Sequence, residues 1–325
     1  MNAVKRAILL IMLATLTALL SGCAAGINEP SVSPEGVISL PEGVETADDG
    51  SAIIRVYISE SGTIEEMSLE EYLPGVVAGE MNPSWPQEAL RAQAILARTY
   101  TLKFISEKKS AHEGADISTD IKEAQAYAPD RINDNVKKAV SSTKGIVLIS
   151  SENELINAWF HAHSGGKTAM AKEGLNFSGD EPEYITSVSG MENDEADIAA
   201  AEWTADFSAH ELQSILSDMG IGSIDVHSFT ILEKGTSGRA TVFSINGSEV
   251  NAAEFRIAAG STKMRSTLLS ALFLTDGGGV TMSGKGYGHG VGMSQWGAYA
   301  QAQSGKKGEE IAEYYFTTVK TARIE

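Results

Sequence analysis

Residues 68–81 read Ser68-Leu69-Glu70-Glu71-Tyr72-Leu73-Pro74-Gly75-Val76-Val77-Ala78-Gly79-Glu80-Met81. Ser68 with Glu71 three residues later fits a capping box, in which two side chains bind free N–H groups at the start of a helix. The apolar run at 76–81 ends just before a turn that contains Pro83. These signals predict a helix that begins after Ser68 and carries Glu80 near its end.

A second helix is predicted directly downstream, over about 86–106. Ser84 and Gln87 repeat the capping-box spacing. The residues that fall near one face of this helix are Gln87, Arg91, Arg98 and Leu102. From the residues alone, Arg91 and Arg98 fit either a solvated stripe or a structural ion pair with Glu88.

The remaining pattern predicts an α+β fold of mixed helices and short antiparallel strands. The expected elements are a strand at 52–58 with Gly62 in the following turn, paired strands at 145–150 and 155–161, a helix at 208–219, short strands through 226–257 with a hairpin at Asn246-Gly247, and a helix at 308–316. We expect one catalytic core, formed by 51–193 and 263–325, with a smaller inserted α+β subdomain at 194–262.

The N-terminal residues have the pattern of an export signal. Lys5 and Arg6 precede an apolar run of 14 residues at 7–20, which is shorter than the roughly 20 residues of a membrane-spanning helix. The string Leu20-Ser21-Gly22-Cys23 resembles the bacterial lipobox, in which the cysteine thiol is acylated. We therefore predict a lipoprotein signal peptide at 1–22, a lipid on Cys23 and a flexible tether at 23–50, with an uncleaved anchor as the alternative. The domain would then lie on the outer face of the bacterial cytoplasmic membrane, towards the cell wall.

Charge and cysteine content narrow the possible functions. The formal net charge is −18, and loss of residues 1–22, which carry two positive charges and no negative ones, takes it to −20. Nucleic-acid binding requires a basic surface, so it is not expected. Cys23 is the only cysteine, which excludes a disulfide or thiol chemistry in the exported domain.

The glycine-rich segment at 277–297 does not fit a nucleotide-binding loop. Gly279 and Gly284-Lys285 approach the P-loop spacing, but Gly286 stands where Ser or Thr must ligate magnesium. The alternating glycines at 284, 286, 288, 290 and 292 instead indicate backbone packed closely against a ligand or other backbone, with His289 on the loop.

Three histidines raise the possibility of a metal site. His161 and His163 share a predicted strand and are expected on one face, with His289 as a further candidate. Zinc would need another ligand in addition to this pair, and a spacing of two is weak evidence for it. A hydrogen-bonded histidine near the site is the preferred interpretation.

Glu80 is a candidate acid. Its apolar neighbours indicate partial desolvation, which raises the pKa of a carboxyl and keeps it protonated, so that it can donate a proton to a leaving oxygen. Local chemistry alone favours a surface glutamate at a helix end, and the spacing does not settle the choice between the two.

The chain resembles the stage II sporulation protein D and amidase-enhancer family. One long matching block is 69–81, and another is Gly284-Lys285-Gly286-Tyr287-Gly288-His289-Gly290-Val291-Gly292-Met293-Ser294-Gln295-Trp296-Gly297-Ala298. Shorter matches lie between them at 88–94, 97–100, 116–117, 125–127, 143–145, 164–168, 237–239 and 264–267. The resemblance covers roughly residues 52–325.

The resemblance implies a peptidoglycan lytic transglycosylase, preferring glycan strands already stripped of peptides by an amidase, with Glu80 as its single acid/base. Ordinary glycosidases need two carboxylates. A lytic enzyme protonates the bridging oxygen and then deprotonates the sugar's own 6-hydroxyl, giving a 1,6-anhydro-muramic end. The alternative is a non-catalytic peptidoglycan-binding activator of a cell-wall amidase.

The same matches suggest residues that bind the glycan. The substrate-binding candidates are Arg91, Arg98, Ser164, Tyr184, His289 and Gln295. Tyr184 fits the family's Pro-Tyr-hydrophobic pattern only loosely, as Glu183-Tyr184-Ile185.

No cofactor is expected. Some relatives hold a structural zinc through a His-x5-Cys-x4-His-Cys pattern, but this chain keeps only His112 and has Ser118, Glu123 and Ala124 at the other three positions. One imidazole and one carboxylate do not make a closed tetrahedral zinc site. We therefore predict that no metal binds there.

Overall fold

The structure is a computed structural model that describes residues 36–48 and 50–324. The predicted signal peptide, Cys23 and the first part of the predicted tether lie outside the described residues. No helix in the described part of the chain combines the length and apolarity that a membrane crossing requires.

The fold is α+β, as predicted, with short strands in several small sheets. The helices are α2 Leu69–Glu80, α3 Gln87–Glu107, η1 Pro129–Arg131, α4 Asp134–Ser142, α5 Ala171–Leu175, α6 Ile198–Ala201, α7 Ala209–Asp218, α8 Ala252–Ala258, α9 Gln295–Gln303 and α10 Gly308–Tyr314. The strands are β1 Val37–Ile38, β2 Glu45–Thr46, β3 Ala52–Ile58, β4 Thr63–Ser68, β5 Ile117–Ser118, β6 Ile146–Ile149, β7 Phe160–His161, β8 Glu202–Phe207, β9 Phe229–Lys234, β10 Ala240–Ile245, β11 Ser248–Asn251, β12 Leu269–Leu274, β13 Val280–Lys285, β14 Met293–Ser294 and β15 Lys320–Ile324.

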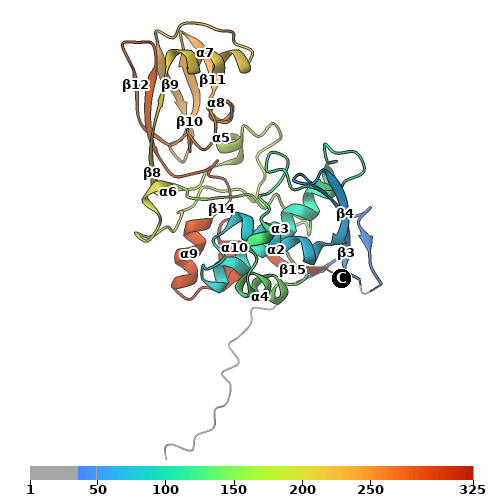
Figure 1. The fold of residues 1–325 in the computed structure, drawn as a ribbon. Coiled ribbons are helices and arrows are strands. Elements are labelled where there is room, and N and C mark those ends of the chain that lie inside the picture. Colours follow the sequence, from blue (N-terminus) through green and yellow to red (C-terminus); the bar gives the residue numbers. More distant parts are fainter. Residues whose placement is uncertain (1–35, 49, 325) are drawn as a thin grey trace, which may run out of the picture. The chain divides into compact units, whose positions relative to one another are not determined.

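Helix α3 is the centre of the larger hydrophobic core. It packs against α2, α4, α9 and α10, which are drawn around it in Figure 1. Its small residues Ala89, Ala92, Ala94 and Ala97 are fully buried, and their lack of bulk lets the neighbouring helices approach closely. This packing brings α9 and α10, from the C-terminal part of the chain, to the same helix that α2 packs against.

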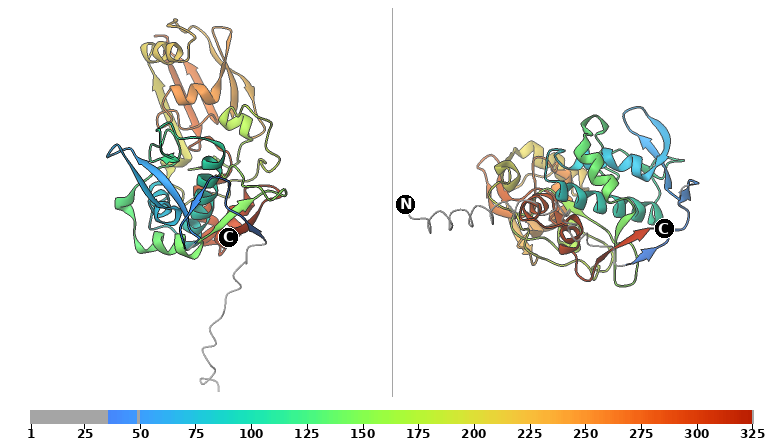
Figure 2. Two further views of the ribbon diagram at one scale, coloured as in Figure 1. Left: turned by 90° about the vertical axis from the view of Figure 1, so that its right-hand side faces the viewer. Right: turned by 90° about the horizontal axis from the view of Figure 1, so that it is seen from below.

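The described part of the predicted tether is attached to the core. β1 pairs in parallel with β15, with Val37 opposite Arg323, and the two strands lie side by side in Figure 2. β2 pairs antiparallel with β3. These ladders contradict a flexible tether over 36–48, because backbone hydrogen bonds to the core hold both strands.

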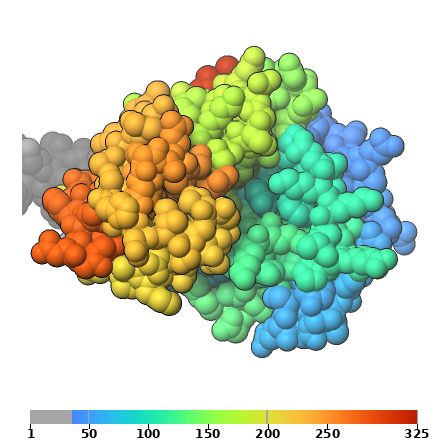
Figure 3. Space-filling view, turned by 90° about the horizontal axis from the view of Figure 1, so that it is seen from above, coloured from blue at the N-terminus to red at the C-terminus, as the bar shows by residue number. Residues whose placement is uncertain are grey.

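A second hydrophobic cluster extends further along the chain than the insert we predicted. Its buried residues run from Trp203 to Met282, past the predicted boundary at 262. β12 and β13 belong to it because β13 pairs with both β12 and β8. Figure 3 shows part of its surface in yellow to orange.

Most predicted elements occur, but one predicted strand pair forms only at its turn end. The hairpin at Asn246-Gly247 joins β10 to β11, with φ of 52° and 83° at the two turn residues. Residues 155–161 were predicted to pair with 145–150. Only the ends nearest the turn pair, through an antiparallel bridge between Ile149 and Leu155 and a bond from Ile156 N–H to the Leu148 carbonyl. The ladder of β6 is formed with β15, and β7, only two residues long, pairs with β14.

The two predicted capping boxes differ in outcome. Ser68 Oγ accepts from Glu71 N–H and Glu71 Oε2 accepts from Ser68 N–H, as predicted. The second was wrong: α3 begins after Pro86, with no side-chain cap, and Ser84 N–H donates to Asn82 Oδ1. The fixed φ of proline suits the start of a helix without a side-chain cap.

This difference predicts unequal effects of two similar substitutions. Ser68→Ala should lower the free energy of unfolding by about 1 kcal/mol, because it removes an N-cap. Ser84→Ala is the matched control and should change it by less than about 0.5 kcal/mol. Urea denaturation of both variants measures the difference, and equal effects would contradict it.

Candidate functional site

Glu80 lies at the C-terminal end of α2, and a backbone N–H is directed at its carboxylate. Ala126 N–H donates to Glu80 Oε1 at 2.7 Å. Glu80 is half-buried, at the edge of the core formed by the preceding apolar residues. The carboxyl is therefore held in one place while part of it stays accessible.

Two glycines in α2 make this contact possible. A Cβ at Gly79 would lie 2.7 Å from the backbone of Ala126, and one at Gly75 would lie 2.2 Å from the ring of Tyr127. Gly75 O also accepts from Ala128 N–H at 2.9 Å. The segment 126–128 thus packs directly on the helix backbone, which brings the Ala126 N–H within reach of Glu80.

Gln295 is the second polar group at Glu80. Its side chain donates a hydrogen bond to the Glu80 carboxylate. Gln295 Nε2 also lies 3.3 Å from Gln93 Oε1 of α3. Gln295 is the first residue of α9, whose N-cap Ser294 accepts from Gly297 N–H. The glutamine is nearly buried, so its amide has a fixed orientation.

The site raises the pKa of Glu80 to about 7. Burial is the main cause because it disfavours the charged form, and the hydrogen bonds from Ala126 and Gln295 oppose it. Close to neutral pH the carboxyl is therefore partly protonated and exchanges its proton readily. A group with such a pKa is suited to act as acid and as base in turn.

The raised pKa predicts a pH-dependent stability. Below the ordinary value of 4.5 the carboxyl is protonated in both states, whereas up to about 7 only the folded chain retains the proton. The free energy of unfolding therefore falls as pH rises through this window, by about 3 kcal/mol for this group. Glu80→Gln should consequently be more stable than the unaltered protein at pH 8 and equal to it near pH 4.5. Urea denaturation at both pH values measures this, and a difference independent of pH would contradict it.

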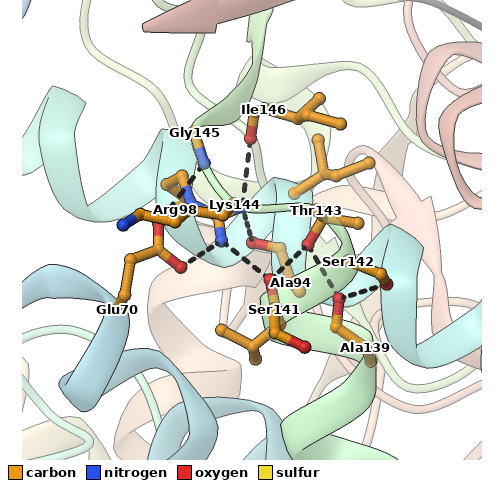
Figure 4. A network of polar contacts seen from close by, with 12 residues as sticks. Glu70, Ala94, Arg98, Ala139, Ser141, Ser142, Thr143, Lys144, Gly145 and Ile146 are labelled. Carbon is orange, nitrogen blue, oxygen red and sulfur yellow. Dashed lines mark hydrogen bonds and ion pairs between the residues drawn. The ribbon is translucent and has the colours of Figure 1, made fainter. Parts of the chain in front are cut away.

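Arg98 does not reach the site, contrary to the prediction that it binds substrate. Its side chain is 1% exposed and forms two hydrogen bonds of 2.7 Å with the Glu70 carboxylate. It also donates to the Ile146 carbonyl at 3.1 Å. Figure 4 shows this network between α2, α3 and the segment before β6. Every strong donor of Arg98 is thus used within the fold.

Arg91 likewise serves the packing of helices. Its guanidinium pairs with Glu88 and with the nearly buried Glu309 of α10, and donates to Ser142 Oγ at 2.7 Å. The ion pair with Glu88 was one of the two interpretations open from the sequence. Arg91 therefore joins α3 to α4 and α10 and leaves no strong donor for a sugar.

Ser164 and Tyr184 are also bonded within the protein. Ser164 is fully buried, and its Oγ accepts from Gly166 N–H at 3.0 Å. Tyr184 Oη accepts from the backbone N–H of Asn157 at 2.9 Å. It lines a separate pocket with Lys103 and Thr318. Neither residue contacts Glu80 in the described hydrogen bonds.

His289 lies on the glycine-rich loop, and its ring contacts that of His161. Its Nδ1 accepts from Val291 N–H at 3.0 Å, and it also bonds the Phe160 backbone. Burial lowers the pKa of His289 to about 3, so the ring is neutral. The predicted close backbone packing is confirmed at Gly288, where a Cβ would lie 2.7 Å from His161 Cβ. Of the six substrate-binding candidates, only Gln295 is brought to Glu80.

Sequence reasoning missed several residues that shape the site. Ala126 acts through its backbone, which no residue type can signal, although 125–127 was among the matching blocks. Arg239 is fully buried and donates to the Ser164 carbonyl at 2.6 Å. Glu192 accepts from Ser294 Oγ and from Ser164 N–H, both at 2.6 Å. Glu192 thus holds the N-cap of α9 next to Gln295.

The residues at the zinc positions of the family do not fit a metal. His112 stacks on Tyr57 with ring centroids 3.6 Å apart, and Glu123 accepts from Ser110 Oγ and Ala111 N–H. Within residues 36–48 and 50–324, no three His, Cys, Asp or Glu side chains are grouped as metal ligands would be. The absence of zinc stays a prediction.

Comparisons with known proteins identify a family model and several relatives. A family model described as stage II sporulation protein matches residues 57–149, which contain Glu80, and a domain of unknown function matches 177–292. Stage II sporulation protein D of Bacillus subtilis (strain 168) is 32% identical over 292 residues, which are 85% of this chain and 80% of that protein. The protein of the same name from Bacillus amyloliquefaciens is 31% identical over 312 residues, 91% of this chain and 86% of the relative.

A third relative has a different name. The amidase enhancer of Bacillus subtilis (strain 168) is 28% identical over 288 residues, 75% of this chain but 39% of that longer protein. Two of these relatives are thus named for sporulation and the third for the enhancement of an amidase. The chain belongs to the stage II sporulation protein D family.

Proposed function

We propose that this chain is a lytic transglycosylase that cuts peptidoglycan glycan strands, preferably peptide-stripped ones, with Glu80 as its single acid/base. The observation that carries the proposal is a half-buried carboxyl of pKa about 7, bound by one backbone N–H and one glutamine side chain. Such a group is protonated often enough to donate and basic enough to accept at neutral pH.

The first step breaks the glycosidic bond. Glu80 donates its proton to the bridging oxygen, which leaves as a hydroxyl with the bonding electron pair, and positive charge develops at the anomeric carbon. The Glu80 carboxylate formed at that moment already accepts from Ala126 N–H and from Gln295. Because both donors are in place beforehand, the anion needs no reorganisation to be stabilised.

The second step restores the acid. The Glu80 carboxylate takes the proton of the sugar's 6-hydroxyl as that oxygen bonds to the anomeric carbon. The product is a 1,6-anhydro-muramic end and no water is consumed. One carboxyl thus returns to its starting state, so no second acidic residue is needed, in contrast to hydrolytic glycosidases.

A second function has support from the name amidase enhancer carried by one relative. In this alternative the chain binds glycan without cutting it and activates a cell-wall amidase. In both cases the proposed partners are glycan strands, with a cell-wall amidase as a further one, and nucleic acid is not expected. The proposed location, on the outer face of the cytoplasmic membrane through a lipid on Cys23, is also common to both. No cofactor is proposed.

Incubation with peptide-free glycan strands tests the proposal. Mass spectrometry should find shorter strands with 1,6-anhydro-muramic ends. Ordinary reducing ends would indicate hydrolysis and overturn the lytic reaction. Strands left intact while an added amidase is accelerated would establish the alternative.

A further inference from the structure

Three aromatic side chains form a cluster that the proposed chemistry leaves unused. The ring centroids of Trp85 and Trp296 are 4.6 Å apart, and Tyr299 lies 5.2 Å from Trp85 and 5.3 Å from Trp296. The planes of the rings are tilted against one another by 54° to 67°. Part of the face of each ring is therefore left uncovered by the other two. All three residues are half-buried, not part of the buried core.

The cluster is continuous with the acid site along α9. Gln295, which donates to Glu80, precedes Trp296 directly and lies four residues before Tyr299. Residues three or four apart lie on the same side of a helix, so Tyr299 lies near both Trp296 and Gln295, whereas the adjacent residues Gln295 and Trp296 do not face the same way. Trp85 joins them from the loop between α2, which ends at Glu80, and α3. The aromatic cluster is thus carried by α9, which also supplies Gln295, and by the loop that directly follows Glu80.

The loop that carries Trp85 is held rigidly. Trp85 N–H donates to the Asn82 carbonyl at 2.9 Å. Asn133 and Asn135 of the segment entering α4 donate to the Pro83 carbonyl, and Asn135 also donates to that of Trp85. Trp296 N–H donates to the Ala162 carbonyl at 3.0 Å. The backbone that carries each indole is thus fixed in place before any ligand arrives, which limits the entropy lost on binding.

Polar acceptors lie at one edge of the cluster. Tyr299 Oη donates to Glu195 Oε2 at 3.0 Å, and Gln303 Nε2 donates to the same oxygen at 2.8 Å. Asn193 Nδ2 donates to Gln303 Oε1 at 3.1 Å. Glu195, Gln303 and Asn193 are all exposed. The side chains of these three residues are neutral or negatively charged. They can accept hydrogen bonds from the hydroxyl and amide groups of a ligand, but they disfavour a ligand that carries phosphate.

Aromatic faces beside such acceptors match the chemistry of a pyranose ring. One face of the sugar carries C–H bonds whose weakly positive hydrogens meet the negative face of an aromatic ring. The sugar's edge carries hydroxyl and acetamido groups that donate to carboxylate and amide oxygens. A binding site of this kind combines an apolar surface with a few polar groups that fix orientation.

We propose that Trp85, Trp296 and Tyr299 form an aromatic subsite that holds a neutral N-acetylated sugar ring of the glycan strand next to Glu80. This subsite rests on the proposed function, since it assumes a glycan substrate, but it serves binding whether or not the strand is cut. In this arrangement the glycan strand crosses α9, and the polar edge of the sugar ring is directed towards Glu195.

Binding of a β-1,4-linked N-acetylglucosamine tetramer, measured by isothermal titration calorimetry, tests the subsite. Trp296→Ala and Tyr299→Ala should each weaken binding about 10-fold, as loss of an aromatic contact does. Tyr299→Phe retains the ring and should lose less affinity than Tyr299→Ala. The matched control is Phe273→Ala, an aromatic residue 64% exposed on β12, which should leave affinity unchanged. Thermal unfolding establishes that each variant is folded.

The outcomes separate this inference from the proposed reaction. Unchanged affinity in both alanine variants, an equal loss in Phe273→Ala, or no saturable binding by the unaltered protein would overturn the subsite. Binding that depends on Trp296 and Tyr299 without any strand cleavage would support the subsite and remove the lytic reaction. Cleavage with an unaltered KM in Trp296→Ala would keep the reaction and reject the subsite.

Discussion

Glu80→Gln is expected to reduce glycan cleavage about 100- to 10,000-fold, the range that a positioned general acid contributes. The amide has nearly the same shape as the protonated carboxyl but has no acidic proton to give to the bridging oxygen. It is also unable to take the proton of the 6-hydroxyl in the second step. Release of 1,6-anhydro-muramic ends over time, measured by mass spectrometry, gives the rate.

The control for this substitution is Glu66→Gln, which removes the same charge from an exposed position on β4. It should leave the rate unchanged. Glu80→Gln should remain folded, because it removes a charge that burial disfavours. Cleavage that survives in Glu80→Gln would reject Glu80 as the acid, while equal losses in both variants would indicate an effect of charge alone.

The pH profile supplies a second readout of the same assignment. The first step needs protonated Glu80, so the rate should fall as pH rises above about 7, the pKa of this carboxyl. Gln295→Ala removes one hydrogen bond that favours the charged form and should move this decline to higher pH. A decline that stays in place would exclude Gln295 as a donor to Glu80.

The contrast between Glu80 and its surroundings shows what the sequence determines. The helix around Glu80 follows from local signals, because Ser68 and Glu71 are near neighbours whose capping geometry depends on few atoms. The pKa of Glu80 does not follow from them, because it depends on burial by the tertiary fold and on opposing hydrogen bonds from Ala126 and Gln295, 46 and 215 positions away. Among the signals in the sequence, only the family resemblance links residues 69–81, 125–127 and 284–298.

The failed predictions have the same origin. Residues 155–161 have strand-forming composition, but pairing partners are chosen by the tertiary fold: only Leu155 and Ile156 pair with β6, while Phe160–His161 pair with β14. The arginines were predicted on one helix face by their spacing. That spacing does not reveal Glu70 and Glu309, which neutralise Arg98 and Arg91 from other helices.

The buried position of Arg98 predicts a large effect on stability in place of substrate binding. Arg98→Ala should lower the free energy of unfolding by about 3–5 kcal/mol, the usual cost of breaking a buried ion pair by removing one partner. It leaves Glu70 without its cation and the Ile146 carbonyl without its donor. Chemical denaturation measures the loss, while the affinity for N-acetylglucosamine tetramer should stay unchanged at a temperature where the variant is folded.

Arg55→Ala is the control that separates burial from charge. Arg55 also pairs with a carboxylate, that of Asp116 at 2.6 Å, but its side chain is 48% exposed against 1% for Arg98. Water solvates both partners of an exposed pair once it is broken, so this change should cost less than about 1 kcal/mol. If Arg98→Ala instead kept its stability and lost glycan binding, the guanidinium would have to reach the substrate. The substrate-binding role of Arg98 that the family resemblance implies would then be correct, and the inference that Arg98 serves only the fold through its pair with Glu70 would be wrong.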